Sequence, residues 1–240
     1  MDEIGGYVAH PKMNQLLASL PDSELQVLLP LLQLVSLTAG ETLAEAGRKS
    51  PLIYFPINAL VAHSREMSDG LAIDTSTVGA EGMLGCGGLI GTSLHRLYVV
   101  QSGLSYRLDG EAFVLLMSSH PIIADMCTRG VQLVLRKISI ELACCHFHSI
   151  HQRVARWILA QDDCNQTGGI DVTHQSIANS LGVRREAVSL ALPKMAGCSI
   201  TRGHLEITDR SLLEQESCEC YFQLKTTNPA QIKLPFSDSR

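Results

Sequence analysis

The sequence predicts an α+β protein with an antiparallel β-roll (jelly-roll-like) near its N-terminus, a long central helix and a helical C-terminal region that ends in two short strands. Three observations support this. Short apolar β-rich runs alternate with Gly, Pro and Asp-Gly between about Val35 and Leu108. Helical periodicity then runs from Pro121 to about Cys145. Finally, two short helices are joined by a glycine turn at Gly182.

Composition is that of a globular protein. The chain has 240 residues, 45% hydrophobic and 18% charged, which fits one or two domains with real cores. The best apolar run, 25–37, is interrupted by Pro30 and Gln33, so no membrane span or membrane partner is predicted. The opening Met1-Asp2-Glu3 lacks the basic and apolar regions of a secretory signal, and we expect a cytoplasmic protein.

Eight cysteines require an explanation other than disulfides in that compartment. No CxxC pair is present, which argues against a zinc ribbon or a thioredoxin-type site. Most of these thiols are expected to pack as small hydrophobic groups.

Charge is divided unevenly along the chain. Residues 1–118 hold 6 Lys and Arg against 12 Asp and Glu, whereas residues 119–240 hold 13 against 12. The total of −5 argues against nucleic acid as a partner, because phosphate contacts dominate such binding. Arginines clustered in the second half weaken that objection.

The N-terminal half begins with two helices. Residues 14–20 form a short apolar helix closed by Pro21, and Asp22 is a candidate N-cap for the next. In the β-rich region that follows, Asp69-Gly70 between two apolar runs predicts a hairpin.

After Asp109-Gly110 the pattern becomes helical. A short helix is expected over 111–118, and Pro121 suits the first position of the next helix. One apolar stripe of this long helix suggests a dimer seam: Ile123, Met126, Gly130, Leu133, Lys137 and Ile140. A rival stripe fits nearly as well: Val131, Val134, Ile138 and Leu142. One stripe could face a partner and the other the β-domain, and a core helix without a seam is the alternative.

Residues 173–188 have the pattern of a helix-turn-helix. Thr173 can cap the first helix, small Ala178 permits close helix packing, and Gly182 supplies the turn. The second helix opens with Arg185 and Glu186, the side-chain types that read guanine and cytosine edges in the major groove. The alternative is an ordinary helical hairpin with a solvated charged end.

Together with the segments around it, this motif resembles the Crp/Fnr family of bacterial transcription regulators. The resemblance rests on 148–159, 173–188, 201–210 and 218–221 in the second half, and on 14–21, 53–56 and 78–85 in the first. It implies a cyclic-nucleotide-binding-like sensor over 12–118, a dimerisation helix over 119–145, a winged helix-turn-helix over 146–224 and a loose tail over 225–240. The implied partners are double-stranded DNA, a second copy of the chain, RNA polymerase and an unidentified small-molecule effector.

The resemblance also implies roles for particular residues. The base readers would be Arg185, Glu186 and Ser189. The contacts to the DNA backbone would come from Thr173, His174, Gln175, Arg184 and, in the wing, Arg202.

Two departures from the family pattern are visible. Leu190 stands where many members place a base-reading arginine, so a different sequence preference is expected. Pro193 falls where the recognition helix should continue, and the segment up to Arg202 is about three residues short. Because proline breaks a helix interior, the helix is predicted to stop at Leu192.

The effector site is predicted at Glu81, Cys86, His95 and Arg96. Cyclic-nucleotide-binding members of the family use a glutamate on the ribose and an Arg-Ser/Thr pair on the phosphate. Here Cys86 replaces the glutamate and His95-Arg96 the pair, so cyclic AMP binding is not expected. Arg96 is interpreted as a solvated surface arginine rather than an anion ligand.

The run Cys144-Cys145-His146-Phe147-His148, with His151, is dense in metal-ligand types. Adjacent cysteines on a helix point about 100° apart and do not easily share a metal, so packing is favoured and no metal or cofactor is assigned. No phosphate loop or hydrolase motif is present, so the protein is not predicted to be an enzyme. A degenerate signalling module and a metal or thiol redox sensor are the alternatives to DNA-binding regulation.

Overall fold

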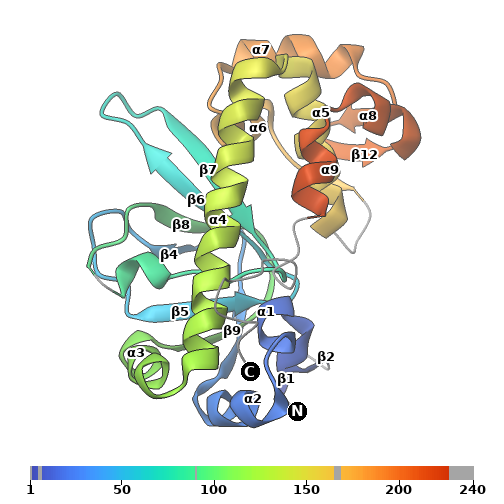
Figure 1. The fold of residues 1–240 in the computed structure, drawn as a ribbon. Helices are drawn as coiled ribbons and strands as arrows, with labels where there is room; N and C mark the ends of the chain where they lie inside the picture. Colours follow the sequence, from blue (N-terminus) through green and yellow to red (C-terminus); the bar gives the residue numbers. More distant parts are fainter. Residues whose placement is uncertain (1, 5–6, 90, 165–168, 227–240) are drawn as a thin grey trace. The chain divides into compact units, whose positions relative to one another are not determined.

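A computed structural model of the chain describes residues 2–4, 7–89, 91–164 and 169–226. It divides into two compact units (Figure 1). One contains the chain up to residue 64 together with 76–136, and the other contains 65–75 and 137–226. From residue 227 onward the predicted tail lies outside the described residues.

The first unit opens with small elements. Strands β1 (Asp2–Ile4) and β2 (Tyr7–Ala9) pair, and a 3-10 turn (Pro11–Met13) leads to α1 (Gln15–Ala18) and α2 (Asp22–Leu28). Buried Asn14 caps α1 through its Oδ1, and its Nδ2 donates to the carbonyls of Pro56 and Gly82. Asp22 is the first residue of α2 and not its cap, because Pro21 holds that position.

The predicted β-roll is present as two antiparallel sheets. One has the order β3-β9-β5, from Gln33–Leu37, Gly103–Asp109 and Leu52–Pro56; the other has the order β4-β8-β6-β7, from Thr42–Ala44, Arg96–Gln101, Leu60–Glu66 and Ala72–Val78. Both sheets contribute buried side chains to one apolar cluster, among them Tyr54, Val61 and Leu97. The predicted Asp69-Gly70 turn links β6 and β7, with Gly70 at φ 83°.

Helices α3 (Gly110–Ser119) and α4 (Pro121–Phe147) follow, the second starting at Pro121 as expected. The prediction that the stripe containing Leu133 forms the dimer seam is wrong. Leu133 is fully buried within its own unit, and a Cβ on Gly130 would lie only 2.8 Å from Met83, which shows how closely α4 packs there. The large apolar α4 side chains that stay exposed after residue 130 are Val131, Leu135, Leu142 and, at the end of the helix, Phe147.

The second unit is helical with a small sheet. After α5 (Ile150–Cys164) come β10 (Ile170–Asp171), α6 (His174–Leu181), α7 (Arg185–Ala191), β11 (Cys198–Thr201), β12 (His204–Ile207), α8 (Arg210–Glu216) and α9 (Cys220–Lys225). The sheet order is β10-β12-β11. One core joins α5, α6, α7, the sheet, α8 and α9, through residues that include Trp157, Ile177, Val188, Leu205 and Tyr221.

No helix of the described residues is long and apolar enough to cross a membrane.

Candidate DNA-binding surface

Local sequence signals build the helix-turn-helix. Thr173 and Ser176 form a capping box, each hydroxyl accepting from the other residue's backbone N–H at 3.0 Å. Gly182 ends α6 at φ 63°, a conformation that costs a glycine little. The Val183 N–H then donates to the Ala178 carbonyl at 3.0 Å, which fixes the turn into α7.

A buried arginine supports this turn. Arg153 on α5 is only 6% exposed, and its Nη2 donates to the Leu181 carbonyl at 2.6 Å and to the Cys145 sulfur at 3.2 Å. Arg156, also on α5, is buried as well. Arg156 is bound by both carboxylate oxygens of Glu141, at 2.6 and 2.7 Å.

The first turn of α7 presents two of the predicted base readers. Arg184, Arg185 and Glu186 are all exposed, while Val188 and Ala191 on the opposite face are buried in the core. Leu190 is also exposed, at 67%, although it is apolar. The helix ends at Ala191 and passes into a 3-10 turn over Leu192–Lys194. The predicted effect of Pro193 is thus confirmed.

Ser189 differs from the other predicted base readers because its hydroxyl already has a partner. It lies 2.8 Å from Nδ1 of His174, on the first turn of α6. The structure therefore brings together one predicted base reader and one predicted backbone contact. Nearby, the Gln175 amide donates to Asn179 at 2.7 Å.

The wing forms despite the shortened segment after Pro193. Strands β11 and β12 pair antiparallel with Thr201 opposite His204, leaving Arg202 and Gly203 as a two-residue turn. Their φ angles of 51° and 86° are those of a type I′ turn. Arg202 is the one non-glycine residue with positive φ in the described part of the chain, and its side chain is exposed at the tip.

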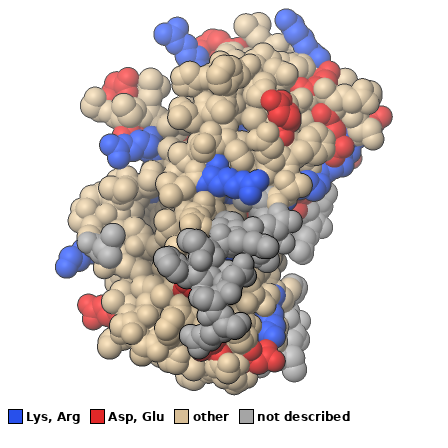
Figure 2. All heavy atoms as spheres, viewed as in Figure 1, with Lys and Arg blue, Asp and Glu red and all other residues tan. Residues whose placement is uncertain are grey.

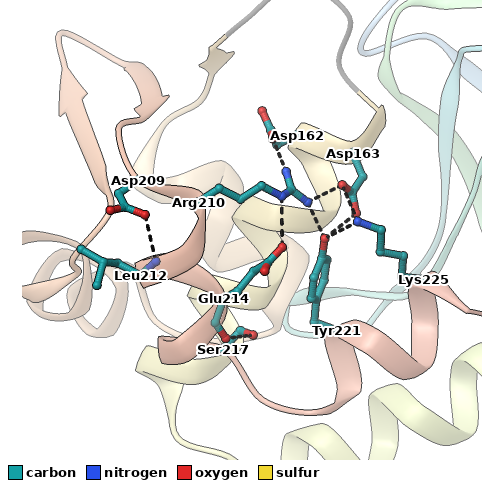
Figure 3. A network of polar contacts seen from close by, with 9 residues as sticks. All are labelled: Asp162, Asp163, Asp209, Arg210, Leu212, Glu214, Ser217, Tyr221 and Lys225. Carbon is teal, nitrogen blue, oxygen red and sulfur yellow. Dashed lines mark hydrogen bonds and ion pairs between the residues drawn. The ribbon is translucent and has the colours of Figure 1, made fainter.

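A polar network holds the C-terminal helices on α5 (Figure 3). Arg210 binds Asp162, Asp163, Glu214 and the Tyr221 hydroxyl, and that hydroxyl donates to Asp163 at 2.8 Å. Lys225 also contacts Tyr221, at 3.1 Å. The network joins α5, α8 and α9.

Basic side chains project from the part of the second unit that carries α7, with acidic ones among them (Figures 1 and 2). The exposed cations of α7, the turn after it and the wing are Arg184, Arg185, Lys194 and Arg202. Such a surface can bind phosphates and base edges together, provided that acidic neighbours do not cancel its charge.

The four predicted effector residues have partners of their own. Arg96 is half-buried, donates to the Thr42 hydroxyl at 2.8 Å and lies 5.6 Å from the Tyr98 ring, so it is not the freely solvated arginine expected. The neighbouring His95 ring packs edge-on against His63. Glu81 accepts from the Gly79 N–H at 3.0 Å, within its own turn.

Cys86 begins a short 3-10 turn over Cys86–Gly88 and contacts Cys127 of α4. The hydrogen bond with Cys127 and burial raise the pKa of the Cys86 thiol well above its ordinary value. A neutral thiol at this position cannot replace the charge of a carboxylate.

Comparison with known proteins agrees with this architecture. Residues 152–216 match the Crp-like helix-turn-helix domain. FixK2 from Bradyrhizobium japonicum superposes with a TM-score of 0.66 at 14% identity, covering 78% of this chain and 98% of its own. The c-di-GMP-responsive regulator CLP of Xanthomonas campestris gives 0.65 at 14%, covering 78% and 99%. A CRP/FNR-family regulator from Thermus thermophilus gives 0.65 at 17%, covering 77% and 98%.

No curated protein sequence matches the chain. The fold and the site define a β-roll protein with a winged helix-turn-helix. More particularly, residues 152–216 are a Crp-like helix-turn-helix domain, and the chain has the fold of the Crp/Fnr regulators.

Proposed function

We propose that the protein is a transcription regulator that binds double-stranded DNA sequence-specifically, as a homodimer in the cytoplasm. The observation that carries the proposal is the exposure of Arg185 and Glu186 on the first turn of α7. This helix is the second of a helix-turn-helix whose N-terminal cap and turn are both formed. A recognition helix reads base edges with its N-terminal residues.

Each exposed group on this surface has a natural partner on DNA. Arg185 suits guanine O6 and N7, and Glu186 suits the cytosine amino group. Leu190, apolar and exposed, suits a thymine methyl group, where arginine would require a guanine. Arg202 on the wing and the α6 N-terminus with Thr173, His174 and Gln175 suit phosphates.

Ser189 is a weaker candidate for base contact than Arg185 and Glu186. Its hydroxyl bonds His174 and would have to leave that partner to reach a base. We therefore assign the pair first to positioning α7 on α6, with base contact by Ser189 as a secondary role.

The proposed dimer uses the exposed stripe of α4. Val131, Leu135 and Leu142 are 42%, 60% and 60% exposed and recur at spacings of four and seven, as in a coiled-coil seam. Two copies joined this way would present two recognition helices to half-sites about one DNA turn apart.

Selection from a library of random DNA duplexes tests this function directly. We expect enrichment of an inverted repeat with half-sites about 10 base pairs apart, each containing guanine for Arg185. Absence of any enriched sequence would overturn sequence-specific binding, and an enriched single half-site would overturn the dimer. The effector and any contact with RNA polymerase stay predictions.

A further inference from the structure

Four residues with sulfur or nitrogen ligand atoms meet at one place in the second unit. Cys144 lies near the end of α4, His148 lies in the bend that follows, and Cys218 and Cys220 lie just before and at the start of α9. One ligand atom from each falls within 4.8 Å of all the others. The three cysteines are almost completely buried and His148 is half-buried.

The spacing of these atoms suits a tetrahedral ion. Sγ of Cys144 and Sγ of Cys218 are 3.5 Å apart, and Sγ of Cys220 is 3.6 Å from Nδ1 of His148. Zn–S bonds of about 2.3 Å and Zn–N bonds of about 2.0 Å give tetrahedral edges of about 3.8 and 3.5 Å. These two distances match the tetrahedral edges to within a few tenths of an ångström, and the other pairs of ligand atoms lie within 4.8 Å of each other.

The second nitrogen of His148 has the partner typical of a metal-bound histidine. Its Nε2 lies 3.1 Å from a carboxylate oxygen of Glu219. With the proton on Nε2 donated to Glu219, the lone pair of Nδ1 points to the sulfur atoms. Such a carboxylate partner fixes the tautomer and ring orientation of a ligating histidine.

A buried cation is available to balance the charge. Three thiolates and one divalent ion carry a net charge of −1, and Arg156, 4% exposed, interacts electrostatically with both Cys144 and Cys218. Its Nε is buried and has no hydrogen-bond partner among the described residues.

Cys145, which is adjacent to Cys144 in the sequence, does not belong to the cluster. Cys145 accepts a hydrogen bond from Arg153, on a different side of α4, and is not among the four. This agrees with the angle of about 100° between neighbouring residues on a helix. The network around Tyr221 holds α9, and with it Cys220, in place without help from an ion.

We propose that Cys144, His148, Cys218 and Cys220 form a structural Zn²⁺ site. Soft thiolates with one imidazole select zinc over magnesium or calcium, and four protein ligands leave no open position for catalysis. The ion would join the end of α4 to the start of α9, the two ends of the DNA-binding domain. This proposal stands independently of DNA binding.

Metal analysis of the full chain, purified with its thiols reduced, tests the proposal. We expect one zinc per chain in the wild type and in Cys145→Ser, and loss of zinc in Cys144→Ser. Cobalt added to metal-free protein should give the visible spectrum of tetrahedral thiolate coordination. If the reduced wild type bound neither ion, or if the two serine variants bound zinc equally well, the proposal would be overturned.

A variant on the surface keeps the test independent of folding. Glu219 is 68% exposed, so Glu219→Gln leaves the core intact while weakening the partner of His148. Zinc affinity measured by competition with a chelator should fall about 10- to 100-fold. An unchanged affinity would contradict ligation by His148 through Nδ1. If the purified protein contained a Cys144–Cys218 disulfide and took up no zinc after that disulfide was reduced, the disulfide would replace the metal site as the explanation of the cluster.

Discussion

The Nη2 atom of Arg153 donates to the main-chain carbonyl of Leu181 at 2.6 Å, which ties α5 to the last residue of α6. Both groups are buried, so this contact satisfies a carbonyl at a helix end that has no partner within its own helix. The turn that sets the direction of α7 therefore depends on an arginine about thirty residues earlier in the chain.

Arg153→Met should destabilise the domain by about 1–3 kcal/mol, because methionine fills similar space but leaves the Leu181 carbonyl unpaired. Urea unfolding followed by the fluorescence of Trp157, on the same helix, measures this. Arg184→Met, at an exposed position, is the matched control and should change stability by less than about 0.5 kcal/mol. Equal effects of the two substitutions would contradict the role of Arg153.

Substitution of Arg202, at the tip of the wing, should have opposite effects on the stability of the domain and on DNA binding. Arg202 has φ 51°, so Arg202→Gly should relieve backbone strain and stabilise the domain by about 1 kcal/mol. The same change should weaken binding to every DNA sequence, because it removes one phosphate contact. Thermal unfolding and a salt titration of binding measure both, and Arg202→Asn, which tolerates this φ, should lose only the binding. A wing variant that bound DNA as well as wild type would exclude Arg202 from the interface.

The exposed stripe of α4 gives a prediction about assembly. Leu135→Glu should dissociate the proposed dimer with little change in thermal stability of the chain, because burying the carboxylate in a seam costs several kcal/mol. Leu133→Glu, one of the buried positions, should instead unfold its unit. Sedimentation equilibrium separates the two, and a Leu135→Glu variant that remained dimeric would place the interface elsewhere.

Cyclic AMP should not bind with micromolar affinity. Cys86 is held by Cys127 as a neutral thiol, and Arg96 is bound to Thr42. Loss of a charge-assisted hydrogen bond costs about 1.5–3 kcal/mol, or roughly 10- to 150-fold in affinity. Isothermal calorimetry is the check, and saturable heat at micromolar cyclic AMP would show that another group takes the place of the carboxylate.

Local signals explain what was predictable from the sequence. Thr173, Gly182 and Pro193 each act within a few residues of themselves, through a cap, a turn and a helix stop. The alternation of apolar runs likewise sufficed for the β-roll and its Asp69-Gly70 hairpin. Elements determined by such short-range chemistry lie where the sequence predicts them.

Long-range pairings were not predictable. Arg156 is buried because it pairs with the half-buried Glu141 of α4, and a helical pattern within α5 does not reveal such a partner. Cys218 and Cys220 lie 74 and 76 residues beyond Cys144, and only their own Cys-x-Cys spacing gives a signal. Periodicity identifies the apolar face of α4 that contains Leu133, but it does not say whether a partner or the chain's own first unit covers that face.

Comparison of two arginine variants on specific and random DNA tests the central claim most directly. Arg185→Ala should weaken binding to the selected sequence about 5- to 150-fold, the value of 1–3 kcal/mol for a bidentate guanine contact, while random DNA loses at most one phosphate equivalent. Arg202→Ala should weaken both alike and reduce the salt slope by about one. Equal losses on both DNAs for Arg185→Ala, or no effect of either variant, would contradict base reading by α7.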